Sequence, residues 1–92
     1  MVDAQQRLVR QDGVLVQEAH GQTVLLRLAD GSYYALDDVG AAVWDLVDGQ
    51  RSVEEIITAI HAAFDAPADV IRTDVLAFTE DLLAEGLLQR GA

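Results

Sequence analysis

Two histidines, His20 and His61, are the only imidazoles of the chain, and imidazole is a common general base and metal ligand in proteins. His20 falls in an expected turn and His61 on the polar side of an expected helix, so we predict that they stay apart and solvated. The acidic pairs Asp37–Asp38 and Glu54–Glu55 each stand where a helix begins, where the helix dipole favours negative charge. The sequence therefore predicts no enzyme, no metal site and no cofactor.

The segment Gly31–Gly49 (GSYYALDDVGAAVWDLVDG) carries residues suited to binding another chain and none suited to catalysis in its expected strand half. It carries the adjacent residues Tyr33 and Tyr34, whose side chains point to opposite faces if the segment begins as a strand. One tyrosine can then pack inward while the other borders a binding surface, because a tyrosine ring is apolar and its hydroxyl needs a polar partner. The alternative is that both are ordinary strand residues.

Three strands are expected to position these tyrosines: Val14–Ala19, Thr23–Ala29 and Ser32–Leu36. The middle strand places Val24, Leu26 and Leu28 on one face, with Leu25 and Arg27 on the other. Asp30-Gly31 predicts a two-residue type I′ turn before the third strand, and His20-Gly21-Gln22 an earlier turn. The result is an antiparallel meander in which the third strand is an edge without proline, lysine or inward charge, able to accept an added peptide strand.

Three helices are expected after Leu36, each with its own boundary signals. Asp37 is the predicted N-cap of the first helix, Ser52 with Glu55 forms a capping box for the second, and Pro67 opens the third, which Gly86 ends. The order of elements predicts an α+β domain of three strands followed by three helices, similar in outline to a winged helix-turn-helix. Trp44 lies off the apolar stripe of the first helix, and we expect it to be buried.

The third helix presents two rows of side chains. At about 100° per residue, a core stripe is predicted at Ile71, Val75, Phe78 and Leu82. A second row lies about 100° away and consists of Arg72, Leu76, Thr79 and Leu83. This row is either the margin of a wide buried face or the second wall of a groove beside the edge strand.

Composition limits the partners. The 92 residues predict one domain, with residues 1–12 as a flexible arm and residues 13–92 as the folded part. There is no cysteine, no signal peptide and no apolar run near the ~20 residues of a membrane span, so we expect a cytoplasmic protein without a membrane partner. An open strand edge permits a monomer or a weak dimer.

The net charge of −10 repels nucleic acid and favours a basic or apolar peptide, although acidity can also serve solubility alone. A winged-helix transcriptional regulator is the main alternative. Its recognition helix would be the third, where five acidic residues face Arg72, a pattern that phosphates repel.

The succession YYALDDVGAAVWDLVDG, SVEEIITAIHAAF and VIRTDVLAFTEDLLAEGLL resembles the PqqD-like family, the precursor-peptide recognition elements of ribosomally made, modified peptides. The resemblance runs from about Val14 to Leu88. Its most specific pieces are Tyr34-x-Leu36, Gly40-x-x-x-Trp44, Asp48-Gly49 and the stretch from Asp74-Val75 to Gly86-Leu87-Leu88.

The resemblance implies a non-enzymatic domain that binds the leader of a precursor peptide as a strand added to the third strand, in the cleft beside the third helix. It implies delivery of that peptide to a modifying enzyme or leader peptidase, with a lasso-type pathway mildly preferred over pyrroloquinoline quinone or mycofactocin pathways. Carried over by position, the leader backbone meets Ser32, Tyr33, Tyr34, Ala35 and Leu36, and the opposite wall consists of Arg72, Leu76, Thr79, Glu80 and Leu83. A structural subunit of an enzyme complex is a further alternative.

Overall fold

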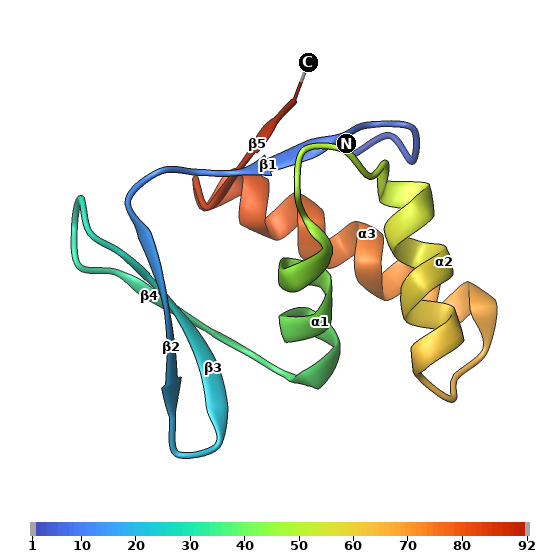
Figure 1. The fold of residues 1–92 in the computed structure, drawn as a ribbon, viewed down its shortest axis with the longest axis horizontal. Coiled ribbons are helices and arrows are strands. Elements are labelled where there is room, and N and C mark those ends of the chain that lie inside the picture. The colour runs from blue at the N-terminus through green and yellow to red at the C-terminus, as the bar shows by residue number, and fades with distance from the viewer. Residues whose placement is uncertain (1, 92) are drawn as a thin grey trace.

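A computed structural model describes residues 2–91 of the chain and shows a small sheet beside three helices (Figure 1). The sheet projects to one side, and the helices gather on the other. In chain order the elements are β1 (Leu8–Arg10), β2 (Val14–Ala19), β3 (Gln22–Arg27), β4 (Tyr33–Leu36), α1 (Asp38–Leu46), α2 (Val53–Ala63), α3 (Ala68–Ala84) and β5 (Leu88–Arg90).

The three-stranded sheet is an antiparallel meander in the order β2-β3-β4, which confirms the predicted α+β architecture. The first of its two turns lies where it was predicted, and the second differs from the predicted type I′ turn. His20 and Gly21 both have positive φ, at 53° and 78°, which a type I′ turn requires. At the second turn only Gly31 has positive φ, and its N–H donates to Arg27 O at 2.9 Å, which closes a wider loop.

One face of the meander is buried. Leu25 on β3 lies opposite Tyr34 on β4, and Leu36 two residues further on is buried as well. Side chains alternate along each strand, so Tyr33 and Ala35 point away from this face. The alternation therefore separates the two adjacent tyrosines, as the sequence predicted.

The helix boundaries follow their capping residues. The Asp37 carboxylate accepts the Gly40 N–H at 2.7 Å, and Ser52 and Glu55 form both hydrogen bonds of the predicted capping box. Gly86, with a φ of 72°, ends α3. The core lies where the helices meet β1, β3, β4 and β5, and its largest fully buried side chains are Trp44, Leu8, Leu25, Ile56, Ile60 and Leu82.

The prediction for the N-terminal segment needs correction, because the part of the expected arm that the structure describes packs on the domain. Leu8–Arg10 pairs antiparallel with Leu88–Arg90, so the two ends of the chain form a ribbon across the helices (Figure 1). Leu8 is 1% exposed, and Val2 is buried too. A three-residue strand whose partner lies at the far end of the chain leaves no periodic pattern to recognise.

Arg10 fastens this ribbon to the end of α1. Its guanidinium lies over the Trp44 ring, 5.2 Å from the centroid, and its Nη2 donates to Trp44 O at 2.7 Å. Trp44 itself is 1% exposed, which confirms its predicted burial. Among residues 2–91, no helix is both long enough and apolar enough to cross a membrane.

Candidate functional site

The outer edge of β4 has backbone groups available for an added strand. Arg27 N donates to Ser32 O at 2.8 Å, so the Ser32 carbonyl points toward β3. Backbone polar groups alternate in direction along an antiparallel strand, and therefore Tyr34 and Leu36 also face β3. Tyr33 and Ala35 direct their N–H and C=O groups to the other side, where no described strand pairs with β4. This side is an open edge.

The β4 side chains form an exposed outer surface and a buried inner surface along that edge. Tyr33 is 78% exposed and Ala35 is exposed beside it on the outer face of the sheet. Tyr34 is half-buried and Leu36 buried on the inner face. A peptide strand added here would alternate in the same way, with every second side chain directed inward toward α3.

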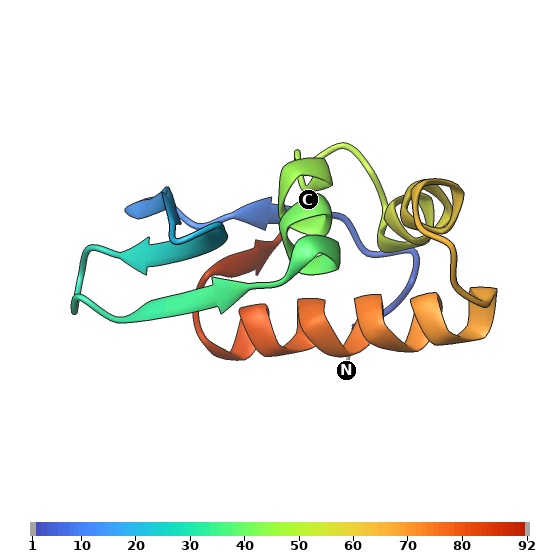
Figure 2. The ribbon, with the colours of Figure 1, turned by 90° about the horizontal axis from the view of Figure 1, so that it is seen from below.

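Helix α3 provides the wall below this edge (Figure 2). The ring of Phe78 meets the ring of Tyr34 edge-to-face, with centroids 6.4 Å apart and planes inclined by 64°. A cleft of about 330 Å³ lies next to Phe78, between α3 and the start of α1. Its apolar lining includes Val39, Val43 and Phe78, and its carboxylates are Asp37, Asp74 and Asp81.

Acidic side chains surround the inner tyrosine. Burial raises the pKa of Tyr34 above its ordinary value, and the charges of Asp81, Glu85 and Asp37 raise it further. These carboxylates come from α3 and from the residue that follows β4. The inner side of the open edge is therefore apolar at Phe78 and negatively charged around it.

The loop before β4 is tied to the end of α3. Arg27 pairs with Asp30 at 2.7 Å and also donates from Nη1 to Glu85 O. Ser32, the first residue of the predicted site, donates from Oγ to Asp30 Oδ1 at 2.7 Å. The hydrogen bonds from Arg27 and Ser32 hold the pKa of Asp30 well below its usual range. This network fixes the entry of β4 relative to α3.

The predicted α3 wall needs correction, because the structure does not bring its residues to the β4 edge. Thr79 is fully buried, and Arg72 forms an ion pair with Glu54 on α2. Leu76 lies two residues before Phe78, about 200° away around the helix, and is partly buried on the core. The remaining predicted wall residues lie outside the cleft too: Leu83 is partly buried on the core, and Glu80 is exposed.

The α3 wall was misplaced because the buried side of α3 is rotated about the helix axis relative to the predicted core stripe. Thr79 can be buried because its hydroxyl donates to carbonyls of its own helix, Val75 O at 2.9 Å and Leu76 O at 3.1 Å. Phe78, predicted to be core, is turned toward β4 instead. Its row along the helix, Asp74, Phe78, Asp81 and Glu85, was visible in the sequence as acidic residues on both sides of an aromatic residue.

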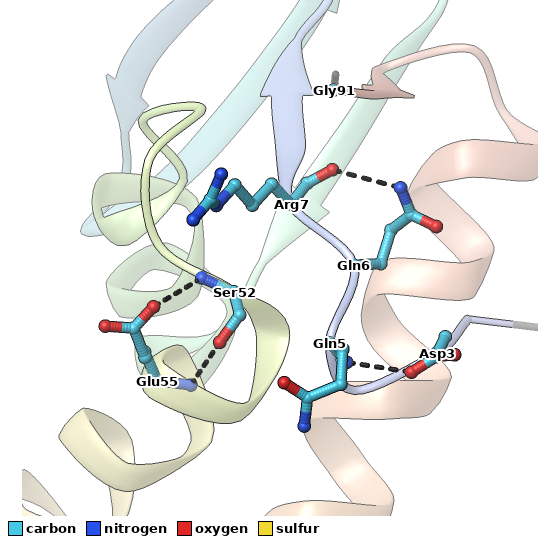
Figure 3. Close-up of a pocket in the computed structure, with 7 residues that line it drawn as sticks. All are labelled: Asp3, Gln5, Gln6, Arg7, Ser52, Glu55 and Gly91. Atoms are coloured by element: carbon cyan, nitrogen blue, oxygen red, sulfur yellow. Dashed lines mark hydrogen bonds between the residues drawn. The ribbon is translucent and has the colours of Figure 1, made fainter.

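A second hollow lies far from this edge, between the N-terminal segment and the start of α2 (Figure 3). It measures about 440 Å³ and has polar walls. Its side chains already serve local structure: Ser52 and Glu55 cap α2, and Asp3 accepts the Gln5 N–H at 2.8 Å. These hydrogen bonds give the hollow a structural role and no evident ligand.

The described residues show no evident catalytic, metal-binding or DNA-binding site. His20 lies in the β2–β3 turn and His61 in the last turn of α2. In Figure 1 the β2–β3 hairpin and helix α2 lie on opposite sides of the domain. Residues 2–91 contain no cluster of three or more histidine, aspartate or glutamate side chains arranged to hold a metal ion. Helix α3 exposes Asp69, Asp74 and Asp81, and its one arginine is paired with Glu54, which disfavours contact with DNA phosphates.

Comparison with known proteins identifies the family. The model of the family described as coenzyme PQQ synthesis protein D (PqqD) matches residues 22–88, which include the sheet edge, all three helices and the cleft. The chain belongs to the PqqD family. The resemblance on which the sequence interpretation rested is thereby confirmed.

Relatives in this family are PqqA binding proteins. The one from Rhizobium meliloti (strain 1021) is 35% identical over 79 residues, covering 84% of this chain and 79% of the relative. The one from Xanthomonas axonopodis pv. citri (strain 306) is 34% identical over 77 residues, covering 84% of each protein.

Two solved structures share the fold, and both contain a leader peptide. TbiB1 in complex with the TbiA(beta) leader peptide is 31% identical, with a TM-score of 0.76 over 88% of this chain and 94% of TbiB1. Lasso peptide synthetase B1 complexed with the leader peptide is 17% identical, with a TM-score of 0.78 over 90% of this chain and 98% of that protein. The second likeness supports the fold alone.

Proposed function

We propose that this PqqD-family chain is a non-catalytic recognition domain that binds the leader segment of a ribosomal precursor peptide. The leader is added as a strand to the open edge of β4 and lies against Phe78 of α3. The observation that carries the proposal is the outward direction of the Tyr33 and Ala35 backbone groups, next to a cleft with an apolar wall. A leader-bound relative at 31% identity supports it.

The bound leader is presented to a modifying enzyme or a leader peptidase of the same pathway. Relatives named as PqqA binding proteins and a relative bound to the TbiA(beta) leader support a peptide as the partner that is presented. Their names indicate two different ligands, PqqA and the TbiA(beta) leader peptide, and both are used as candidate leaders to probe this chain.

An edge proline tests the proposed site. In Ala35→Pro the N–H directed at the leader is lost, while the hydrogen bonds between β3 and β4 stay intact. Val16→Pro is the matched control, because the Val16 N–H points to the free edge of β2. This direction follows from the hydrogen bond between Leu28 N and Gly13 O at 2.9 Å, which sets the alternation along β2.

Binding is measured by calorimetry with the two leaders and with peptides selected on the full chain from a displayed library of random 15-residue sequences. We expect Ala35→Pro to abolish binding and Val16→Pro to leave it within a factor of two, with the amide spectra of both variants showing a folded domain. Selected peptides that bind folded Ala35→Pro as well as wild type would contradict the proposal. Stable co-purification with an enzyme without any peptide would favour the structural-subunit alternative.

A further inference from the structure

The inner side of the β4 edge lacks a positive charge to balance its carboxylates. Asp37, Asp74 and Asp81 line the cleft, and none of them belongs to an ion pair among residues 2–91. Asp37 already caps α1 through Gly40, which leaves Asp74 and Asp81 as the two exposed carboxylates of the cleft without a capping role. No arginine lines the cleft.

The chain has six arginines, and most of them are engaged away from the cleft. It has no lysine, and four of its arginines bind partners away from the cleft. Arg27 pairs with Asp30, Arg51 with Asp48 and Arg72 with Glu54, while Arg10 lies over Trp44. The other two arginines, Arg7 and Arg90, do not line the cleft either, so a cation at Asp74 and Asp81 would come from a bound ligand.

The spacing of the two carboxylates fits an added strand. Asp74 and Asp81 lie one turn before and one turn after Phe78, at about 6 Å and 4.5 Å along the helix axis. Inward side chains of a strand recur every second residue, at about 7 Å. A peptide that places an apolar side chain on Phe78 thus brings its next inward side chain to one of the two carboxylates.

From this geometry we infer the chemistry of the peptide. We propose that the leader carries an apolar residue over Phe78 and a lysine or arginine two positions away, whose charge meets Asp74 or Asp81. The inference rests on the proposed function. The carboxylates alone would not define a site, and what makes them one is their position below an open strand edge and beside an apolar wall.

The test uses peptides selected from the random 15-residue library on the full chain, restricted to those that Ala35→Pro no longer binds. We expect enrichment of lysine or arginine two positions from an apolar residue. We further expect the double variant D74N/D81N to bind these peptides at least about fivefold more weakly at 50 mM salt. D65N/D69N is the matched control, because it removes the same charge at exposed positions outside the cleft and should change affinity less than twofold.

Replacing the basic residue of a selected peptide by glutamine completes a double-mutant cycle with D74N/D81N. This change should weaken binding to wild type as much as D74N/D81N does, and it should have no further effect on that variant. Peptides that depend on the β4 edge but lack basic enrichment, or that bind D74N/D81N and D65N/D69N equally, would overturn the inference and leave the proposed function standing. If no selected peptide is sensitive to Ala35→Pro, the proposed function fails and the inference fails with it.

Discussion

Gly40 on α1 and Phe78 on α3 are in such close approach that a side chain at position 40 would press on the aromatic ring. A Cβ atom built on Gly40 would lie 3.2 Å from Phe78 Cε1 and 3.3 Å from Cζ, and 3.1 Å from the capping oxygen Asp37 Oδ1. The Phe78 ring thus lies against Gly40 of α1 and also meets the Tyr34 ring, with the two ring centroids 6.4 Å apart. The glycine of the family-like Gly40-x-x-x-Trp44 pattern therefore positions the wall of the proposed leader site.

Gly40→Ala should weaken leader binding several-fold while leaving the domain folded. The new methyl group moves Phe78 by a few tenths of an ångström, which reduces its contact with the leader. The free energy of unfolding should not fall, because alanine stabilises a helix by roughly 0.5–1 kcal/mol relative to glycine. Calorimetric titration with leader and a thermal melt measure the two effects separately.

Phe78→Leu provides the control for this interpretation. Leucine removes the ring that the methyl group meets, so Gly40→Ala should cost little further affinity in a Phe78→Leu background. Equal losses in both backgrounds would show that Gly40 acts by another route.

Arg10→Gln should destabilise the domain by about 1–2 kcal/mol, because it removes both the charge over the Trp44 ring and the donors to Trp44 O. Urea unfolding followed by tryptophan fluorescence measures the change. Arg90→Gln removes the same charge from the exposed end of β5 and should stay within about 0.5 kcal/mol. Similar losses in the two variants would argue against a specific role for Arg10.

Leu8→Ala should cost about 2–4 kcal/mol of unfolding free energy, because Leu8 is buried in the core although it lies near the N-terminus. Leu15→Ala on β2 is the control, since that side chain is 45% exposed and should cost much less. Equal unfolding midpoints for wild type and Leu8→Ala would restore the flexible-arm prediction.

Asp30 should link stability to acid pH. Its pKa is lowered in the folded state, chiefly by the hydrogen bond from Arg27, so its stabilising effect is present above the unfolded-state pKa of about 4 and is lost as the pH falls below it. Asp30→Asn should therefore reduce the loss of stability between pH 5 and pH 2. Unfolding curves at several pH values measure this, and an unchanged acid dependence would contradict it.

Local signals in the sequence were sufficient for much of the fold. Asp37, Ser52 with Glu55, and Gly86 marked helix boundaries that the structure confirms, because capping depends on neighbouring backbone groups. The β1–β5 ribbon was missed because its hydrogen bonds join opposite ends of the chain, and nothing within Leu8–Arg10 reveals its partner.

The candidate site was predictable in its strand half and was misplaced in its helix half. The alternation at Tyr33 and Tyr34 follows from strand geometry alone. The rotation of α3 depended on Thr79, whose hydroxyl bonds within its own helix and so permits burial of a residue that sequence patterns treat as polar. With Thr79 buried, Phe78 faces β4 and Leu76 does not.

Backbone hydrogen exchange with and without saturating leader peptide tests the central claim most directly. In the free protein the Tyr34 and Leu36 amides are protected by β3, whereas those of Tyr33 and Ala35 point to the open edge. We predict that leader binding slows exchange at Tyr33 and Ala35 and leaves Val16 on the β2 edge unchanged. Unchanged exchange at Tyr33 and Ala35 in a saturated complex, or new protection at Val16 instead, would contradict strand addition to β4.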